Sequence, residues 1–302
     1  MNTATGSKIK IVFVLPTLKA GGAERVISAI VTALNTDIFK PTLLVIGHEK
    51  DAAYDIPNVH TIFLNKNRVL SGIPGVLRYL IQLKPDIAVG SISHVSKVLA
   101  FASYALPKTK FVGREASVST YMKQYAEKKR KRGALSYFMK DYFKRLDAII
   151  SQSDEMKTDL MTSYGIPEAK MVTINNPIAE HFSYRENTNQ DCRYITVGSL
   201  SKVKGHDRIL RALSKLHHEF SYTIVGSGNK KHIEALIEEN NLTSKVSIID
   251  FTKDVPELLA KHTVFLSGSY VEGFPNALLE SCAVGTPALA FKAPGGLSLI
   301  HI

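Results

Sequence analysis

The residues with the clearest capacity for chemistry lie in the stretch SYVEGFPNALLE, residues 269–280. Glu272 and Glu280 flank a turn that leads from an apolar run into a helical one. Gly273 frees the backbone of this turn, and Pro275 suits the first helical turn, where its missing N–H costs nothing. Because carboxylates accept hydrogen bonds from hydroxyl groups, an acid on each side of the turn indicates a ligand that carries hydroxyls.

The same turn also has the features of an anion site. The N–H groups of Asn276 and Ala277, at the expected start of the helix, would face an anion bound there. A phosphate next to hydroxyl groups describes a nucleotide diphosphate joined to a sugar. The alternative is structural: Glu272 stabilises the helix start electrostatically, and Glu280 lies on the surface. On spacing alone, the structural alternative is slightly favoured.

Glycine-bearing turns and basic residues follow other expected strands. Glycine lets a backbone approach a ligand closely, but it also serves wherever a tight turn needs a positive φ, and for the first of these turns the two uses are evenly balanced. Three such strand exits together favour a nucleotide-type ligand, although neither GxGxxG nor GxxxxGK[ST] is present. Lysines at a strand exit would suit a diphosphate, whereas solvent exposure is the commoner fate of a lone lysine. The residues concerned are Gly21, Gly22, Gly198, Lys202, Lys204, His206, Gly226 and Gly228.

Apolar, β-branched runs alternate with helical stretches along the chain, which indicates βα units and parallel sheets, an α/β fold class. The expected strands are KIKIVFVLP, TLLVIG, DIAVGSIS, KFVGRE, DAIISQS, KMVTINNP, RYITVGSL, SYTIVGSG, KVSIIDF, HTVFLSGS and TPALAF. The polar stretch 179–192 predicts a linker. We therefore expect two Rossmann-like domains, 1–185 and 186–302, with the ligand in the cleft between them.

Length and composition bound the class of protein. The chain has 302 residues, 45% of them hydrophobic and 22% charged, which is typical of a globular protein of two domains. Cys192 and Cys282 show no disulfide or metal-site pattern and suit a reducing compartment. No leader peptide or membrane span is evident, so we expect a cytoplasmic protein. The net charge of +11 predicts an anionic partner: nucleic acid, a phosphorylated ligand or a membrane surface.

Taken in order, the motifs resemble those of family 4 glycosyltransferases, which have the GT-B fold. EGFPNALLE followed by AVGTPALAF is similar to the family's EX7E signature, and IVFVLPTLKAGGAERV to its N-terminal glycine loop. VTINNPI resembles the segment before the linker, and VGSLSKVKG the start of the donor domain. The resemblance covers essentially the whole chain. It implies a retaining enzyme that needs no metal or other cofactor and uses a nucleotide sugar, expected to be a UDP-sugar.

The resemblance also implies roles for individual residues. Glu272 would hold a hydroxyl of the transferred sugar and stabilise the transition state, and Lys204 would neutralise the leaving diphosphate. Glu280 would bind the ribose hydroxyls. The other residues implied in donor binding are Gly273, Phe274, Pro275, Asn276, Ala277, Ser199, Lys202, Gly226 and Gly228, and those implied on the side of the first domain are Gly21, Gly22, Arg114 and Glu115.

Three features depart from the family pattern. Ser199 stands where many relatives have Arg, so Lys202 is the candidate to supply the missing charge. Many relatives have His after the strand that reads KFVGRE here, where Arg114 and Glu115 are the candidates. Relatives continue beyond the position of Gly296 for one or two strand–helix pairs and a helix that returns to the first domain. We therefore expect a truncated, incomplete second domain with uncovered apolar faces.

A basic segment lies at 121–145. An apolar stripe at helical spacing predicts a helix that faces the core, formed by Leu135, Phe138, Met139, Tyr142, Phe143 and Leu146. The run KKRKR is expected to be exposed and consists of Lys128, Lys129, Arg130, Lys131 and Arg132. Our hypothesis is that this run binds anionic lipid at the inner face of the membrane and brings the enzyme to a lipid-linked acceptor. Nucleic acid is the lesser alternative, because no nucleic-acid-binding motif is present.

These inferences predict a cytoplasmic, membrane-peripheral, retaining hexosyltransferase. It would move a hexose-type sugar from a nucleotide diphosphate to a lipid-linked or lipopolysaccharide acceptor in surface glycan synthesis. One alternative is an inactive fragment that binds nucleotide or a partner, and a second is a nucleotide-sugar epimerase of the same fold. Turnover of the donor would separate the transferase from the fragment, and an epimerised free donor would identify the epimerase.

Overall fold

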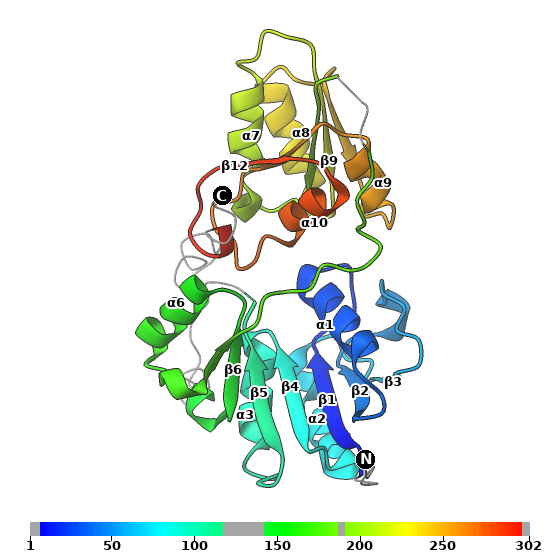
Figure 1. The fold of residues 1–302 in the computed structure, drawn as a ribbon, viewed down its shortest axis with the longest axis vertical. Coiled ribbons are helices and arrows are strands. Elements are labelled where there is room, and N and C mark those ends of the chain that lie inside the picture. The colour runs from blue at the N-terminus through cyan, green and yellow to red at the C-terminus, as the bar shows by residue number, and fades with distance from the viewer. Residues whose placement is uncertain (1–6, 117–141, 187–190, 298–302) are drawn as a thin grey trace, which may run out of the picture. The chain divides into compact units, whose positions relative to one another are not determined.

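The chain forms two compact units, each built on its own parallel β-sheet with helices (Figure 1). The computed structural model describes residues 7–116, 142–186 and 191–297. Unit 1 contains residues 7–116 and 142–177, and unit 2 contains the described residues from 178 onward. The predicted α/β fold class is confirmed for both units.

Unit 1 has a seven-stranded sheet in the order β3-β2-β1-β4-β5-β6-β7, and each strand runs parallel to its neighbours. The strands are β1 (Ile9–Leu15), β2 (Phe39–Val45), β3 (His60–Phe63), β4 (Ile87–Ser91), β5 (Lys110–Arg114), β6 (Ala148–Ser151) and β7 (Met171–Thr173). The described helices are α1 (Gly22–Ala33), α2 (Val69–Leu83), α3 (Ser93–Ala102) and α6 (Asp154–Tyr164), with 3-10 turns η1 (Glu49–Asp51), η2 (Tyr142–Arg145) and η3 (Glu168–Lys170). The sequence prediction omitted only β3 among these strands.

Unit 2 has a five-stranded sheet in the order β10-β9-β8-β11-β12, also parallel throughout. The strands are β8 (Arg193–Val197), β9 (Ser221–Val225), β10 (Val246–Ile249), β11 (Val264–Ser267) and β12 (Ala288–Ala290). The helices are α7 (His206–Leu213), α8 (Lys230–Glu239), α9 (Val255–Ala260) and α10 (Asn276–Val284), and the 3-10 turn η4 spans Lys202–Lys204. All five strands lie where the sequence predicts them.

Continuous apolar runs became strands because parallel strands covered by helices on both faces bury both sets of side chains. In β1 the last five residues are buried, and the same holds for β2. Phe13 and Leu15 of β1 pack with Leu43 of β2 and Ile27 of α1 in one core cluster. Unit 2 repeats this design, with Tyr222 and Ile224 of β9 wholly buried beside Leu210 of α7.

The basic segment of the sequence is described only at its end. Tyr142, Phe143 and Leu146 are buried, so the prediction that the apolar stripe faces the core is confirmed for these three residues. The helix predicted there is a 3-10 turn, η2, rather than an α-helix over its described residues. Leu135, Phe138, Met139 and the KKRKR run lie outside the described residues. Within the described ranges, no helix has the length and apolar character needed to cross a bilayer.

Each sheet has one position where its strand order reverses. In unit 1 the chain builds β1, β2 and β3 toward one edge and then places β4 on the other side of β1; in unit 2 the reversal lies between β8 and β11. Helix-bearing loops leave in opposite directions at such a position, so the carboxyl ends of the two strands border a crevice where open α/β sheets bind ligands. The residues after β8 and β11, and those after β1 and β4, therefore border these two crevices.

Candidate functional site

The loops after β8 and β11 hold the two residues predicted to be catalytic. β11 pairs directly with β8, with Val264 opposite Tyr194 and Phe265 opposite Ile195, so the two loops begin side by side. Lys204 ends the turn η4 after β8, and Glu272 lies in the loop between β11 and α10. The reversal in strand order thus joins residues that stand 68 positions apart in the sequence.

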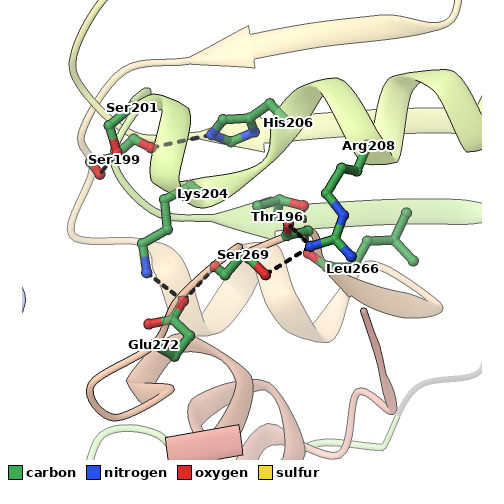
Figure 2. Close-up of polar contacts among 10 residues, drawn as sticks. Thr196, Ser199, Ser201, Lys204, His206, Arg208, Leu266, Ser269 and Glu272 are labelled. Carbon is green, nitrogen blue, oxygen red and sulfur yellow. Dashed lines mark hydrogen bonds and ion pairs between the residues drawn. The ribbon is translucent and has the colours of Figure 1, made fainter. Parts of the chain in front are cut away.

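Lys204 and Glu272 form an ion pair, shown in Figure 2. Lys204 Nζ lies 2.6 Å from Glu272 Oε1, and the two side chains are 29% and 10% exposed. Ser269 Oγ donates a second hydrogen bond, of 2.5 Å, to the same carboxylate oxygen. Two donors on one oxygen fix the direction of the carboxylate, since hydrogen bonds to an ionised acceptor are strong and directional.

The backbone of Glu272 is held independently of its side chain. Its N–H donates to the Pro294 carbonyl oxygen at 3.2 Å, and its carbonyl oxygen accepts from the Gly296 N–H at 2.9 Å. A Cβ at Gly296 would lie 2.6 Å from the Gly273 carbonyl oxygen, so only glycine lets these segments come this close. Gly296, which follows β12, therefore supports the loop that carries Glu272.

The start of α10 differs from the prediction at two positions. Pro275 is the N-cap rather than a residue of the first helical turn, because the helix begins at Asn276. The Asn276 N–H, predicted to face an anion, donates instead to the Phe274 carbonyl oxygen at 2.9 Å. A tight turn over Phe274, Pro275 and Asn276 therefore uses this N–H locally. The part of the anion-site prediction that assigned a free Asn276 N–H is wrong, and Ala277 lies one residue further into the helix.

Glu280 is a buried residue of α10. It lies in the second turn of the helix and is 4% exposed, so the alternative that placed it on the surface is wrong. Phe274 is also buried, at 8% exposure. A buried acid needs partners or a function, since burial of an unpaired charge is unfavourable. Its predicted role toward ribose hydroxyls stays a prediction.

The loop after β8 is arranged around a buried histidine. His206 Nε2 lies 3.2 Å from the Ser199 carbonyl oxygen, and because a carbonyl only accepts, this nitrogen carries the proton. Burial lowers the pKa of His206, which favours the neutral ring. Its Nδ1 is buried without a hydrogen-bond partner in the part of the chain that the structure describes. Ser199 and Lys202 are both exposed, with Ser199 Oγ 2.9 Å from Ser201 Oγ.

Gly226 and Gly228 follow β9 and lie against the loop after β8. Both have positive φ, 154° and 145°. A Cβ at Gly226 would lie 1.8 Å from the Gly198 carbonyl oxygen, and Gly228 bridges to Leu200. The need for glycine here follows from packing between two strand exits, and approach of a ligand to the same backbone stays a prediction.

In unit 1 the residues after β1 make hydrogen bonds and close contacts to other residues of the same unit. Gly21 has φ −156°, which any residue can adopt, so a positive φ does not explain this glycine. A Cβ there would lie 2.3 Å from Glu24 Oε2, and the Gly21 N–H donates to the Tyr54 hydroxyl at 3.2 Å. Glu24 also accepts from Thr17 Oγ1 at 3.0 Å, and burial raises the pKa of its carboxyl group. Gly22 is the first residue of α1.

Arg114 and Glu115 are buried at the carboxyl end of β5. Arg114 Nη2 donates to Asn176 Oδ1 at 2.6 Å and Nη1 to Ser91 Oγ at 3.3 Å. Ser93 Oγ donates to Glu115 Oε2 at 2.5 Å. Burial lowers the pKa of Arg114 to about 10, although the negative charge of Glu115 acts in the opposite direction. Burial also raises the pKa of Glu115. Ser93 follows β4, so this pair reaches the reversal point of the unit 1 sheet.

Several residues of the unit 2 site were missed by sequence reasoning. Ser269 lies inside the quoted motif, but serine has no distinctive spacing. Arg208 donates from Nη1 to the carbonyl oxygens of Gly268 and Ser269 at 3.3 and 3.1 Å, a contact between distant segments. Gly205 was detectable, since a glycine after a basic turn often ends it; its φ is 60°, and a Cβ would lie 1.8 Å from the Gly268 carbonyl oxygen. No group of three or more His, Cys, Asp or Glu side chains that could hold a metal ion occurs in the described ranges.

Comparisons with protein families match both units. The model described as Glycosyltransferase Family 4 matches residues 20–181, and the model described as Glycosyl transferases group 1 matches residues 179–301. The N-acetylgalactosamine-N,N'-diacetylbacillosaminyl-diphospho-undecaprenol 4-alpha-N-acetylgalactosaminyltransferase of Campylobacter jejuni is 25% identical over 282 residues, 88% of this chain and 76% of that protein. The O-antigen biosynthesis glycosyltransferase WclY of Escherichia coli is 31% identical over 140 residues, 43% of this chain and 39% of that protein.

Solved structures share the fold. Sucrose-phosphate synthase from Thermosynechococcus elongatus has a TM-score of 0.80 at 16% identity and covers 98% of this chain and 84% of its own. Anabaena Alr3699/HepE, solved with UDP and glucose, has a TM-score of 0.80 at 17% identity, with 97% and 83% covered. WaaG, a glycosyltransferase involved in lipopolysaccharide biosynthesis, has a TM-score of 0.76 at 19% identity, with 96% and 83% covered. The chain belongs to glycosyltransferase family 4 and has the GT-B fold.

Proposed function

We propose that this glycosyltransferase moves a hexose-type sugar from a UDP-sugar to a lipid-linked or lipopolysaccharide acceptor, with retention of configuration at the anomeric carbon. Unit 2 would bind the donor and unit 1 would supply residues for the acceptor. The observation that carries the proposal is the pairing of Lys204 with Glu272 at the reversal point of the unit 2 sheet. A cation and a carboxylate placed together there suit a ligand that has a diphosphate next to hydroxyl groups.

The two groups would have separate tasks in the reaction. Departure of a nucleotide diphosphate places negative charge on the leaving oxygen, and a fixed cation such as Lys204 stabilises that charge. Glu272, directed by Ser269, would accept a hydrogen bond from a sugar hydroxyl and stabilise positive charge that develops at the anomeric carbon. No step in this scheme requires a metal ion or another cofactor. Lys202, exposed beside the same loop, is available to a second phosphate oxygen.

Two kinds of support point to the class of donor and acceptor. One solved structure with this fold holds UDP and glucose, and another belongs to a lipopolysaccharide galactosyltransferase, WaaB. The Campylobacter relative is named for an undecaprenol-linked acceptor, and WclY for O-antigen biosynthesis. These names support a UDP-sugar and an acceptor of bacterial surface glycan synthesis for this chain as well.

A lipid-linked acceptor would require contact with a membrane surface, and we propose that unit 1 makes it at the cytoplasmic face. In addition to the KKRKR run, two exposed aromatic residues lie at the C-terminal end of α3 and just after it: Phe101 is 57% exposed and Tyr104 is 65% exposed. The guanidinium of Arg145 lies 4.0 Å from the centre of the Tyr104 ring. Aromatic rings and basic groups together favour the headgroup region of an anionic bilayer.

Release of nucleotide diphosphate from a panel of UDP- and GDP-sugars tests the function. Purified chain is incubated with each donor, first without and then with undecaprenol-linked or lipopolysaccharide acceptors, beside the Glu272→Gln and Glu280→Gln variants. We expect release from one UDP-sugar, stimulation by the right acceptor and loss of turnover in the Glu272→Gln variant. A chain that binds UDP but turns over no donor would support the nucleotide-binding fragment, and an epimerised free donor would support the epimerase.

A further inference from the structure

Arg208 lies where it can fix the position of the loop that follows β11. It lies in the first turn of α7, and its Nη1 donates to the carbonyl oxygens of Gly268 and Ser269, directly after β11 (Figure 2). The same guanidinium lies over two aromatic rings, 4.7 Å from the centre of Tyr270 and 4.3 Å from the centre of Phe291. Planar stacking and fixed N–H geometry are properties of arginine that lysine lacks.

The neighbours of Arg208 connect the same two loops. Tyr270 N–H donates to the Val203 carbonyl oxygen at 2.8 Å, and Tyr270 OH donates to Asp207 Oδ2 at 2.7 Å. Phe291 N–H donates to the Ser267 carbonyl oxygen at 2.9 Å, which ties the exit of β12 to the exit of β11. Arg208 therefore stands at the point where the exits of β8, β11 and β12 meet.

Ser269 is the link from this point to the acid. The carbonyl oxygen of Ser269 accepts from Arg208, and its hydroxyl donates to Glu272 Oε1. By holding the backbone of Ser269, Arg208 therefore also sets the direction of the serine hydroxyl. The backbone of Glu272 has its own support from Pro294 and Gly296. An effect of Arg208 on Glu272 therefore passes through the Ser269 hydroxyl rather than through the main chain of Glu272.

We propose that Arg208 is a positioning residue for the glycosyl-transfer reaction: it holds Ser269 so that the serine hydroxyl directs the carboxylate of Glu272. The inference rests on the proposed function for the role of Glu272. It assigns to α7 a part in catalysis that is separate from binding of the nucleotide, because Arg208 points to the β11 loop while Lys204 serves the diphosphate.

A double-mutant cycle tests the proposal. Arg208→Ala, Ser269→Ala and the double variant are compared for kcat of donor turnover, for affinity toward UDP alone and for thermal unfolding. We expect each single variant to lower kcat about tenfold, which corresponds to about 1.4 kcal/mol, while UDP affinity stays within threefold of the wild type. In the Ser269→Ala background, Arg208→Ala should lower kcat less than twofold further, since coupled residues are not additive. Arg208→Lys should recover only part of the loss.

Arg211→Ala is the matched control. Arg211 lies on the same helix, its side chain is 69% exposed, and it contacts Asp207 at 3.4 Å. This variant should leave kcat unchanged. Additive losses in the double variant, an equal loss of UDP affinity, or an unchanged kcat in Arg208→Ala would each overturn the proposal, because each would assign Arg208 a merely structural role or none.

Hydrogen exchange separates failure of this inference from failure of the proposed function. Amides of residues 266–274 should exchange faster in Arg208→Ala than in the wild type or in Arg211→Ala, because the Tyr270 N–H depends on this contact region. Unchanged exchange would overturn the inference whatever the activity. A wild type that neither binds UDP nor turns over any donor would overturn the proposed function, while exchange would still decide whether Arg208 holds the loop.

Discussion

Replacing Glu272 with glutamine should tighten the binding of UDP, although Glu272 is predicted to act on the donor. In the structure Lys204 is paired with this carboxylate at 2.6 Å. A diphosphate that binds Lys204 must therefore displace the Glu272 carboxylate, which is negatively charged like the diphosphate. Glutamine keeps the size of the side chain and an oxygen for Ser269, and it removes the charge that competes with the diphosphate.

The magnitude follows from the contact and its exposure. Glutamine still accepts a hydrogen bond from the charged Lys204, so the substitution removes only the Coulombic part of the ion pair. The Lys204 side chain is 29% exposed, and for a pair partly screened by solvent this part is about 0.5–1 kcal/mol. With tenfold in affinity for each 1.4 kcal/mol, the Kd for UDP should fall about two- to fivefold.

Isothermal titration with UDP measures this directly, and three variants make the result specific. Lys204→Ala should weaken binding, and adding Glu272→Gln to Lys204→Ala should bring no gain, because the competing pair no longer exists. Glu257→Gln is the control, because it also removes one negative charge from unit 2 and breaks an ion pair, of 2.8 Å, with Arg185. The side chain of Arg185 is 38% exposed and that of Glu257 is 47% exposed. An unchanged or higher Kd for UDP in Glu272→Gln would refute the reasoning that the Glu272 carboxylate and the diphosphate compete for Lys204.

Three further predictions concern backbone, pH and surface. Gly205→Ala should destabilise unit 2 by more than about 2 kcal/mol in denaturant unfolding and weaken UDP binding, since a Cβ would lie 1.8 Å from the Gly268 carbonyl oxygen. The control is Gly165→Ala, at a similar φ of 62° but with nothing within 4 Å of the added Cβ, and it should cost only about 1–2 kcal/mol. Burial raises the pKa of Glu115, so the carboxyl group holds its proton more tightly in the folded chain than in the unfolded chain. The free energy of unfolding should therefore fall as pH rises above about 4.5, by up to about 1.4 kcal/mol per pH unit. Glu115→Gln should remove this fall, and parallel pH profiles of the two proteins would contradict the prediction. Replacing Phe101 and Tyr104 together by serine should reduce co-sedimentation with vesicles rich in phosphatidylglycerol at least threefold, and equal binding would exclude this surface from membrane contact.

The fold could be predicted from the sequence wherever burial leaves a local pattern. Strands covered on both faces read as unbroken apolar runs, and eleven expected strands are present. β3 was missed because it is a four-residue strand at the edge of its sheet, with no fully buried residue, so its pattern is weak. The 3-10 turn at Tyr142–Arg145 was read as α-helix because both forms place similar residues on one side over a single turn.

The site could be predicted only as a set of residues, not as a set of contacts. The roles of Glu272 and Lys204 were predicted from the resemblance to family 4 glycosyltransferases, but their pairing depends on strand order, which no local pattern contains. The sequence did not show that the Asn276 N–H donates to the Phe274 carbonyl oxygen, because this tight turn depends on backbone angles rather than residue type. Arg208 has the spacing of an ordinary basic residue on an exposed helix face, and only the approach of the β11 loop gives it a role.

Pairing of Lys204 with Glu272 has a consequence for how the two residues could share one reaction. Both donors to the carboxylate reach the same oxygen, Oε1. When a diphosphate takes Lys204, Ser269 still holds that oxygen, so the carboxylate keeps its direction while it gains capacity to accept from a sugar hydroxyl. Binding of the diphosphate to Lys204 would thus free the acid to accept from a hydroxyl of the sugar joined to that diphosphate. This requires a serine hydroxyl with a fixed direction, which Arg208 provides on our proposal.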